Sequence, residues 1–509
     1  MPRMDLGEKK PSVAAPVEVT PHMIAAAQRD IDIAKERGLS AAEIYRHDFL
    51  PTSSIFEGKL PKKATKSQIV AELEKLSKLT EADTRKPERD LSLIMDLMST
   101  TRSMTMPPDC TTFGDLIHCS LKVARQYNTD ILHVVRDSYI EATIKAAERL
   151  RRENAVDPIV YSDGDITPDL LLPELDKFWP NSLNKVQFQN LVEPLVQNKE
   201  LVDLDVLVSG YTTDDEKFPA ILFKSGRTVM NSSHEEVPSL ESVIEEADDR
   251  LLHHAMFEVK RGAKCILVLS NDSDSVVKLL YCVSKWKQRG LEELYCLFGT
   301  GENRRYLPLH KMHDALGDAM SHVAIKAQVL TGDDYLSKIG TKHAAITSDP
   351  IKYLSCFAQS EEISDAEVWQ AEEFLVKVWV GARRNTSSRT FSQLRLEVYT
   401  SAKNAKSLDT LPPTSSTILG HIKRAHCVLR SFFKIIDETY ESIDYANHGW
   451  VWECGFLLPD PCLNPFPSNK TMTCDCKGKY KNRRCICKRQ NEDCTIFCHK
   501  KKSDICENR

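Results

Sequence analysis

The chain has 509 residues, enough for about two to four domains at roughly 100–200 residues per domain. Its hydrophobic share is 41% and its charged share 28%, ordinary globular values that allow a sizeable core over most of the length. No window approaches the ~20 uninterrupted apolar residues of a membrane helix, and the first residues, MPRMDLGEKKPSVAAP, lack the apolar segment of a secretory signal. We therefore expect an intracellular protein, nuclear rather than cytoplasmic, without a membrane partner.

Charge and cysteine are distributed unevenly along the chain. The formal net charge is −5, so the whole molecule is not a polycation. From residue 474 to 509, however, eleven Lys and Arg outnumber five Asp and Glu, which gives a local charge of +6. Nine of the sixteen cysteines are scattered from 110 to 462, and seven crowd into 474–506. A basic, cysteine-rich end on an acidic body suggests a metal-binding segment that contacts a polyanion.

The patterning divides the chain into five segments. A lead-in expected to be disordered is followed by a helical N-terminal region, in which residues 67–79 form an amphipathic helix. An α/β domain comes next, with an irregular insert that contains short strands such as LDVLVSG. A second helical region and the cysteine-rich basic tail follow. The expected bounds are 1–20, 21–90, 91–360 with the insert at 155–235, 361–465 and 466–509.

Within the α/β segment, short apolar runs alternate with amphipathic stretches. Residues 91–95 (LSLIM), 131–135 (ILHVV) and 265–270 (CILVLS) are typical of buried strands. Residues 112–127 and 239–262 have helical periodicity. Alternation of this kind predicts a mainly parallel sheet with helices on both faces.

Acidic residues follow these predicted strands at the positions where the strands end. In an open α/β sheet, the carboxyl ends of the strands form the edge at which ligands bind. A further acidic pair is expected in the middle of the 239–262 helix, where both side chains can lean toward one cleft. The strand-end acids are Asp96, Asp137, Asp272, Asp274 and, after the run AIKAQVL, Asp334; the helical pair is Glu246 and Asp248.

Acids that converge on one cleft repel one another and stay ionised only when cations neutralise them. Two Mg²⁺ or Mn²⁺ ions, roughly 4 Å apart, would do this and would support phosphodiester hydrolysis. Oxygen ligands favour these ions over zinc. Each carboxylate also has an ordinary alternative role, as a turn former or a helix N-cap, and this alternative stays open for all seven.

Several stretches resemble a group of uncharacterised animal proteins, many of them derived from mobile elements, that carry a PIN-like domain of the flap-endonuclease type. The resemblance covers residues 25–505 and continues through GWVW into the tail. In order, the stretches are LSLIMDLM, TFGDLIHCSLKVA, HVVRDSYIEATIKAAERLRR, EEADDRLLHHA, ILVLSNDSDSVVKLLY, RRYLPLHKMHDALG, LTGDDYLS and LPPTSSTILGHIKRAHCVLRSFF.

The resemblance implies a PIN or flap-endonuclease-like fold in which all seven acids are metal ligands. It also implies that basic residues on the helix after the second strand contact the scissile phosphate, where cations cancel charge on the transferring group. The chain departs from its relatives at Arg136, Asp333 and Tyr335, where a hydrophobic residue, Cys and Thr are usual. The residues implied to face the phosphate are Lys145 and Arg151 or Arg152.

The tail has thiols at short spacings, C-x-C-x8-C-x-C-x6-C-x3-C-x7-C. Thiolates at such spacings can surround a tetrahedral zinc ion, and a structural zinc site supplies folding free energy that a short segment lacks. The pattern resembles the CXC modules of tesmin-like DNA-binding proteins. A reduced, disordered tail and a disulfide framework are the alternatives. The candidate ligands, enough for two four-ligand zinc sites, are Cys474, Cys476, Cys485, Cys487, Cys494, Cys498, His499 and Cys506.

Basic side chains alternate with these thiols. They could grip the phosphates of DNA or RNA without reading the sequence, whereas a solvated terminal segment is the plainer alternative. These residues are Lys477, Lys479, Lys481, Arg483, Arg484, Lys488 and Arg489.

Histidines elsewhere do not indicate a further metal site. His310 and His313 open a predicted helix but lack the glutamate of an HExxH motif, so we expect them on the helix surface. His253 and His254 are expected to pack or to face solvent. The sequence has no GxxxxGK[ST] loop and no GxSxG elbow.

The sequence therefore predicts a nuclease that hydrolyses phosphodiester bonds in DNA or RNA, with Mg²⁺ or Mn²⁺ at the acids and Zn²⁺ in the tail. The alternative from another class is a non-catalytic nucleic-acid-binding or protein-interaction scaffold that keeps the same fold. A purely structural protein with turn aspartates is a third hypothesis. The complete set of acids favours the enzyme, because a decayed site usually loses a ligand charge.

Overall fold

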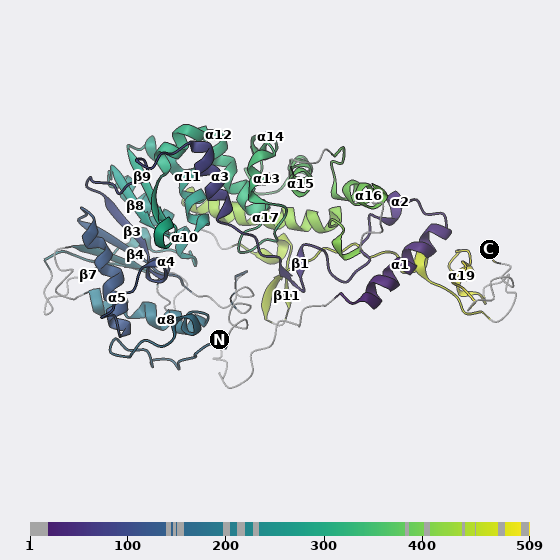
Figure 1. Ribbon diagram of the computed structural model, residues 1–509, viewed down its shortest axis with the longest axis horizontal. Coiled ribbons are helices and arrows are strands. Elements are labelled where there is room, and N and C mark those ends of the chain that lie inside the picture. The colour runs from purple at the N-terminus through teal and green to yellow at the C-terminus, as the bar shows by residue number, and fades with distance from the viewer. Residues whose placement is uncertain are drawn as a thin grey trace.

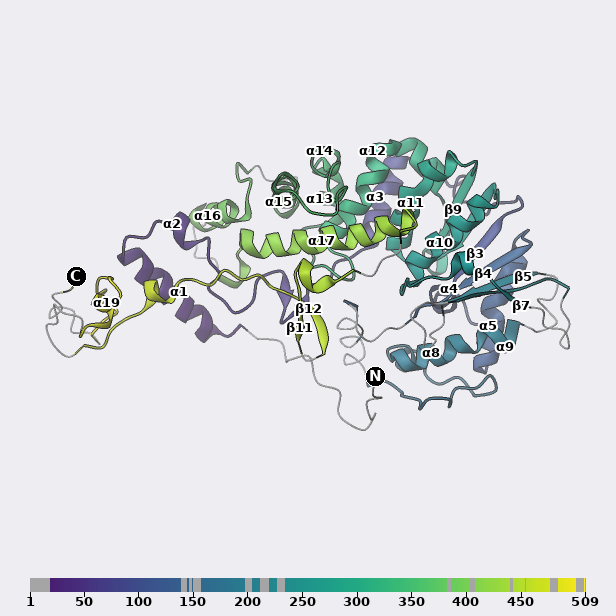
Figure 2. The same cartoon turned by 180° about the vertical axis from the view of Figure 1, so that it is seen from behind.

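The structure is a computed structural model of the chain. Figure 1 shows an elongated molecule with a sheet at one end, helices in the middle, and helix α1 (Pro21–Glu36) beside the tail at the other end; Figure 2 shows the same order from behind. None of the described helices is long and apolar enough to cross a membrane. The described residues are 19–138, 144–145, 149, 157–196, 204–210, 219–226, 234–381, 386–401, 408–439, 443–453, 455–476, 484–499 and 508.

One eight-stranded sheet forms the centre of the α/β part. Its strands are β3 (Ser92–Asp96), β4 (Ile131–Val135), β5 (Asp205–Ser209), β6 (Ala220–Phe223), β7 (His234–Glu236), β8 (Cys265–Leu269), β9 (Glu293–Phe298) and β10 (Arg305–Pro308). Their order is β10-β9-β8-β3-β4-β5-β6-β7. The strands from β9 to β5 are parallel to one another, and the antiparallel strands β10, β6 and β7 lie toward the two edges.

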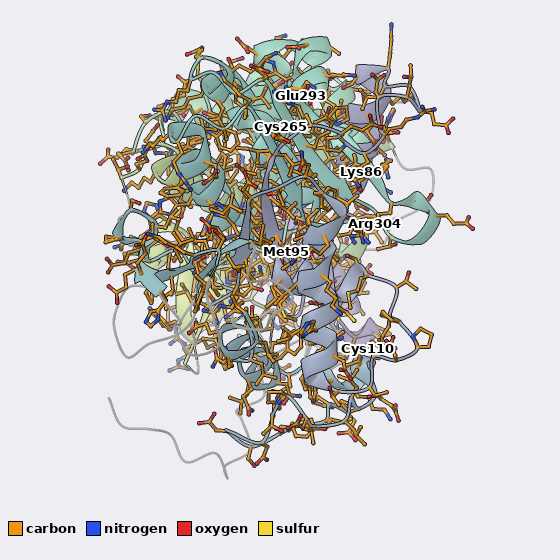
Figure 3. The ribbon with its side chains drawn as sticks, turned by 90° about the vertical axis from the view of Figure 1, so that its left-hand side faces the viewer. Lys86, Met95, Cys110, Cys265, Glu293 and Arg304 are labelled. Atoms are coloured by element: carbon orange, nitrogen blue, oxygen red, sulfur yellow. The ribbon has the colours of Figure 1, made fainter. Side chains whose placement is uncertain are left out.

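The interior strands β3, β4 and β8 are buried along their whole length. Continuous apolar runs suit parallel strands because helices cover both faces of the sheet. Side chains alternate between the faces, so Ile94 packs into the core on one side and Leu93 and Met95 pack into the core on the other. Figure 3 views the molecule from the sheet end, with Met95, Cys265 and Glu293 on successive strands.

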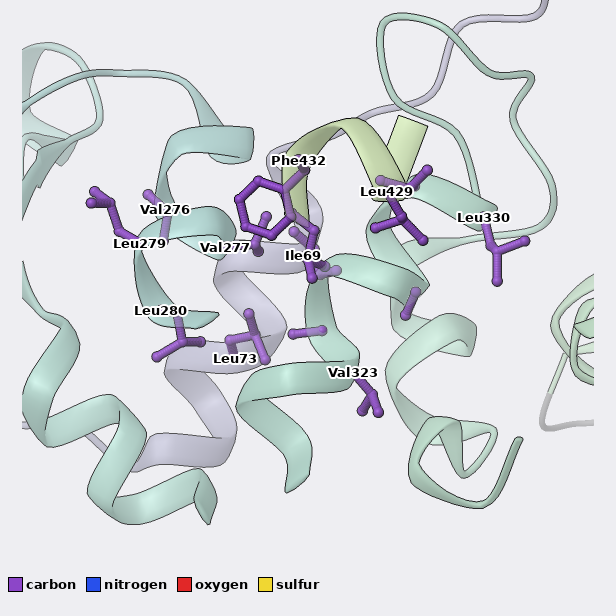
Figure 4. Packing of buried hydrophobic residues seen from close by; sticks show 14 of the residues in the cluster. Ile69, Leu73, Val276, Val277, Leu279, Leu280, Val323, Leu330, Leu429 and Phe432 are labelled. Atoms are coloured by element: carbon purple, nitrogen blue, oxygen red, sulfur yellow. The ribbon is translucent and has the colours of Figure 1, made fainter. Parts of the chain in front are cut away.

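Helices cover both faces of this sheet. On one face, five helices share a core: α3 (Gln68–Ser77), α10 (Ala247–Lys260), α11 (Ser273–Lys287), α12 (Leu309–Leu330) and α17 (Ser415–Ile436). Figure 4 shows part of this core, where Ile69 and Leu73 of α3 and Phe432 of α17 lie beside Val277 and Leu280 of α11. On the other face lie α4 (Leu97–Ser103), α5 (Phe113–Lys122), α7 (Leu175–Phe178), α8 (Ser182–Asn190) and α9 (Val192–Val196).

The middle and the far end of the molecule are mainly helical. Two small hairpins, β1 (Phe56–Glu57) with β2 (Leu60–Pro61) and β11 (Trp450–Glu453) with β12 (Phe456–Pro459), accompany the helices. The remaining helices are α2 (Ala41–Ile44), α13 (Lys342–Thr347), α14 (Pro350–Leu354), α15 (Asp365–Val380), α16 (Phe391–Ser401), α18 (Ser468–Thr471) and α19 (Ile486–Arg489).

The predicted fold class, α/β with a mainly parallel sheet, is confirmed, but two predicted elements were wrong and a third was incomplete. The short strand expected at LDVLVSG in the 155–235 insert is β5, and the insert also supplies β6 and the start of β7 to the sheet. The helix expected over 239–262 begins only at Ala247. The acidic run EEADD surrounds the start of this helix. Acidic side chains are favoured at a helix N-terminus because the backbone N–H groups there are unpaired and carry partial positive charge. The run AIKAQVL is the end of α12 and not a strand.

The prediction that His310 and His313 lie on a helix surface was also wrong. Each residue is only 8% exposed, at the start of α12. His310 accepts a hydrogen bond at Nδ1 from the backbone N–H of Leu294, at 3.2 Å, so contact with β9 buries this end of the helix. His253 and His254 of α10 are buried as well, which agrees with the packing role.

Candidate functional site

Two aspartates end neighbouring strands of the sheet. Asp96 is the last residue of β3, Asp272 follows β8, and these two strands are parallel neighbours. Each also caps the following helix: Asp96 accepts from the backbone N–H of Ser99 and Asp272 from that of Asp274, both at 2.8 Å. They therefore fill the N-cap role that the sequence left open. In the sheet, β4 and β5 lie on one side of β3, and β8 and β9 lie on the other side. The strand order therefore reverses at β3, and the crevice at the carboxyl end of such a switch point is where α/β sheets bind ligands.

The N-terminus of α10 brings further acids to the same edge. Asp137 lies just beyond β4 and accepts a hydrogen bond from the backbone N–H of Ala247, the first residue of α10, at 2.9 Å. Glu246 is the N-cap of this helix, and Asp248 lies in its first turn. These three acids line one cavity of about 580 Å³ together with the two strand-end aspartates.

The loop after α12 adds the last acid. Carboxylate oxygens of Asp272, Asp274 and Asp334 all lie within 4.8 Å of one another. Asp274 also accepts a hydrogen bond from Gln328 Nε2 at 2.7 Å. It lines a second cavity, of about 270 Å³, that shares Glu246, Asp248 and Asp334 with the first. All seven acids singled out in the sequence thus line two joined cavities.

A lysine that the sequence analysis missed lies among these three aspartates. Lys66 lies two residues before α3, and no local pattern marks it, because its partners lie far along the chain (Lys66 and Asp274 are 208 residues apart). Its Nζ atom is within ion-pair distance of every member of the group, at 3.5 Å from Asp272, 2.8 Å from Asp274 and 3.0 Å from Asp334.

Two further lysines pair with the remaining acids. Lys145 forms an ion pair with Glu246, and its Nζ atom lies 3.8 Å from Asp334. Lys278 of α11, which the sequence analysis also missed, has its Nζ atom 2.8 Å from a carboxylate oxygen of Asp248. The cations and acids therefore alternate through the site, and most of the acidic charge has a partner within the chain.

Arg149 is a basic residue of the site that the sequence analysis passed over. Its guanidinium lies 3.2 Å from Glu246, and it lines the larger cavity with Lys145. The i, i+4 spacing of Lys145 and Arg149, which places both on one face of a helix turn, was the signal available in the sequence. Arg151 and Arg152, and most of the predicted helix that contains them, lie outside the described residues.

Asp96 is the acid whose charge is least compensated. Burial raises its pKa well above the ordinary value, and the nearby carboxylate of Asp137 raises it further; the hydrogen bond from Ser99 opposes both effects. Within the described residues Asp96 forms no ion pair with a lysine or arginine. A divalent cation would supply the missing positive charge, so the site fits such an ion.

The other acids show how much the lysines relieve this crowding. Burial raises the pKa of Asp272 to about 6, although Lys66 works against it. Burial also acts to raise the pKa of Asp248, but Lys278, Lys145 and Lys66 together outweigh it, and the pKa of Asp248 is lowered. Cationic partners therefore decide which of these acids are easily ionised at neutral pH.

Four cysteines of the tail form one buried cluster. The Sγ atoms of Cys474, Cys485, Cys487 and Cys494 all lie within 4.8 Å of one another. The sulfurs of Cys474, Cys485 and Cys494 are 3.6 Å apart in each pair. Around a tetrahedral zinc ion with bonds of about 2.3 Å, thiolate sulfurs are roughly 3.8 Å apart, so this group could hold zinc.

Other predicted ligands lie beside this cluster. Cys498 Sγ is 3.9 Å and His499 Nε2 is 3.6 Å from a sulfur of the cluster, and Cys476 packs against it. Cys506 lies outside the described residues. The described cysteines of the tail are free thiols, so the structure has no disulfide framework in the described part of the tail.

Arg37, the C-cap residue of α1, joins the cysteine cluster to the N-terminal helix. Its guanidinium donates hydrogen bonds to the backbone carbonyls of Lys470 at 2.6 Å and Met472 at 2.7 Å. It also lies 3.6 Å from the Sγ atom of Cys487. The Arg37 side chain is only 1% exposed, so α1 and the tail form one packed unit.

Three of the seven basic residues that the sequence singled out in the tail are described, and all three, Arg484, Lys488 and Arg489, are exposed. The other four that the sequence singled out, Lys477, Lys479, Lys481 and Arg483, lie outside the described residues.

No family model, no curated protein and no solved structure matches this chain.

Proposed function

We propose that this protein is a divalent-metal-dependent nuclease that hydrolyses phosphodiester bonds in DNA or RNA. One observation carries the proposal: seven acids from five parts of the chain line two joined cavities at the carboxyl edge of a parallel sheet. Acids at this density need cations, and oxygen ligands suit Mg²⁺ or Mn²⁺. The resemblance to PIN-like proteins of the flap-endonuclease type supports the same function.

The residues divide into those that would hold the ions and those that would face the substrate. Asp137 helps to position the N-terminus of α10 through the hydrogen bond that it accepts from the N–H of Ala247. Lys145 and Arg149 line the larger cavity and would cancel charge on the scissile phosphate. Bound ions would supply activation of a water molecule and stabilisation of the leaving oxygen. The ion-holding acids would be Asp96, Asp137, Glu246, Asp248, Asp272, Asp274 and Asp334.

For the tail we propose a zinc-stabilised module that binds the nucleic-acid backbone. The sulfur separations of 3.6 Å support zinc as the ion. The exposed residues Arg484, Lys488 and Arg489 would contact phosphates, which adds affinity without sequence specificity. The catalytic domain would then act on substrate that the tail helps to retain.

Cleavage by the purified full-length protein tests the proposal. With Mg²⁺ or Mn²⁺ we expect it to cut single-stranded DNA, flapped DNA or RNA. The double change Asp272→Asn and Asp274→Asn should abolish cutting, because it keeps the shape of both side chains and removes two charges. The matched control, Glu362→Gln with Asp365→Asn, changes two exposed acids that line neither cavity and should cut normally.

One observation favours a second function, a non-catalytic scaffold that binds nucleic acid or protein. Lys66, Lys145 and Lys278 already pair with acids of the site, so the chain partly neutralises itself. A scaffold would bind nucleic acid without turnover, and the double Asp→Asn change would leave its affinity little altered. Tight binding without cleavage on every substrate, with either ion, would therefore favour the scaffold over the nuclease.

A further inference from the structure

The group formed by Asp272, Asp274 and Asp334 already surrounds one cation of the chain. Oxygens of the three carboxylates lie within 4.8 Å of one another, close enough for a single ion to touch all three. The ammonium group of Lys66 lies among them, with its closest contact at 2.8 Å. Lys66 therefore occupies the place where a divalent ion would have to bind.

Lys66 belongs to a segment that is fixed to the loop of Asp334. The backbone carbonyl of Lys62 accepts a hydrogen bond from the N–H of Lys338 at 2.8 Å. The side chain of Lys66 is 18% exposed and lines the larger cavity. Because a lysine has a flexible four-carbon stem, its ammonium group can leave the aspartates for this cavity while α3 stays in place.

An ammonium group and a divalent ion cannot share this group of aspartates. Both would lie within about 3 Å of the same oxygens, where two positive charges repel strongly in a partly buried site. The aspartates carry three negative charges when ionised, and the divalent ion satisfies more of that charge than the lysine does. The two cations must therefore occupy the group in turn.

We propose that Lys66 is an exchangeable occupant of the metal site. It holds Asp272, Asp274 and Asp334 together in the metal-free protein and leaves when a divalent ion binds. This inference rests on the proposed function, because it takes the three aspartates as metal ligands. Once displaced, the ammonium group faces the cavity that contains Lys145 and Arg149, so ion binding adds a third cation toward a substrate phosphate.

Titration of Mn²⁺ into the zinc-loaded, full-length protein without nucleic acid tests the exchange. Free Mn²⁺ is measured by electron paramagnetic resonance, and thiolates of the tail compete weakly for this ion. In Lys66→Met the Kd for Mn²⁺ should fall, because the occupant that competes with the ion is gone; an occupant present about nine-tenths of the time would correspond to a fall of about tenfold. Lys75→Met, which changes an exposed lysine of α3, is the matched control and should leave the Kd unchanged.

Thermal unfolding gives a second readout, because the expected difference between Lys66→Met and the wild type depends on whether the ion is bound. Without Mn²⁺, Lys66→Met should unfold at a lower temperature than the wild type, because three aspartates then repel one another. With saturating Mn²⁺ the difference should vanish. Lys66→Gln serves as the second variant if Lys66→Met does not fold, and the same gain in Mn²⁺ affinity is expected for it.

The outcomes separate this inference from the proposed function. If Asp272→Asn with Asp274→Asn abolishes Mn²⁺ binding but Lys66→Met binds like the wild type, the exchange is wrong and the metal site stands. Weaker Mn²⁺ binding by Lys66→Met would also overturn the exchange, because it would make the lysine a support of the bound ion. If the double change alters nothing in the titration, the metal site itself is wrong.

Discussion

His421 of α17 donates a hydrogen bond from Nε2 to the backbone carbonyl of Leu330, the last residue of α12, at 2.9 Å. This bond links the central helical region to the point where the Asp334 loop begins. The imidazole is fully buried, and burial lowers its pKa to about 3. The ring is therefore neutral in the folded protein at physiological pH.

This buried histidine predicts a loss of stability in mild acid. In the unfolded chain a histidine has a pKa of about 6.5, so as pH falls below that value the unfolded state takes up a proton that the folded state refuses. The contribution of His421 to the free energy of unfolding is complete above pH 6.5. It is lost progressively as the pH falls from 6.5 toward the folded-state pKa, which is about 3. At pH 5 the loss for one such histidine is about 2 kcal/mol relative to pH 8.

Urea unfolding at pH 8 and pH 5 measures this contribution. His421→Gln, whose side-chain amide can still donate to Leu330, should lose about 2 kcal/mol less than the wild type between the two pH values. His22→Gln, at an exposed position, should lose as much as the wild type. Equal pH dependence in His421→Gln would contradict the assignment of a neutral buried ring.

The sheet and its acidic edge could be predicted because their signals are local. An apolar run marks each of β3, β4 and β8, and an acid stands just beyond its end, so sequence position alone indicates the edge. The start of α10 was predicted wrongly because helical periodicity extends upstream of it. The hydrogen bond that Asp137 accepts from the backbone N–H of Ala247 is a tertiary contact that helps to fix where that helix begins.

Two lysines of the site, Lys66 and Lys278, could not be predicted, because tertiary contacts place them. Lys66 reaches Asp272 and Asp274 at the start of α11 and Asp334 after α12, more than two hundred residues away, as its 208-residue separation from Asp274 shows. Lys278 lies on one side of α11, a largely buried helix whose other residues are typical of a helix that packs in a core. Charge in a folded site depends on which helices are adjacent, and a single sequence does not specify this adjacency.

The contact between α1 and the tail predicts that Arg37 stabilises the tail without binding the metal. Arg37→Gln removes charge-assisted hydrogen bonds to the carbonyls of Lys470 and Met472, at a cost of about 2 kcal/mol. Limited proteolysis should then cut the tail faster, while zinc content stays at the wild-type level because the cysteines are intact. Arg46→Gln, at an exposed arginine, is the control. Unchanged proteolysis would contradict the prediction.

The exposed basic residues of the tail predict how binding depends on salt. Reversing Arg484, Lys488 and Arg489 to Glu should weaken binding to duplex DNA. The slope of log K against the logarithm of the salt concentration should become shallower by up to roughly 2.7, at about 0.9 per phosphate contact. Fluorescence anisotropy with Ca²⁺ between 50 and 200 mM salt, about the range over which such slopes are measured, gives this value. An unaltered slope would mean that these residues do not contact phosphate. The matched control reverses three exposed basic residues outside the tail, Lys75, Arg289 and Lys423.

The uncompensated charge of Asp96 predicts that Asp96→Asn stabilises the fold and weakens the metal site. Asp96→Asn keeps the N-cap of α4 and removes a buried charge that has no basic partner among the described residues, so without added Mg²⁺ or Mn²⁺ it should raise the free energy of unfolding by about 1 kcal/mol at pH 8. A carboxyl group with a raised pKa takes up a proton as pH falls, which relieves the wild type, so the gain should shrink at pH 5.

The control for this variant separates charge from capping. Asp96→Ala removes both the charge and the cap, whose loss costs about 1 kcal/mol, so it should unfold close to the wild type at pH 8. Mn²⁺ should stabilise the wild type more than either variant, because each lacks a ligand charge at the end of β3. If Asp96→Asn were less stable than the wild type at pH 8, Asp96 would have to be held by a cation, and its place as an uncompensated metal ligand would be wrong.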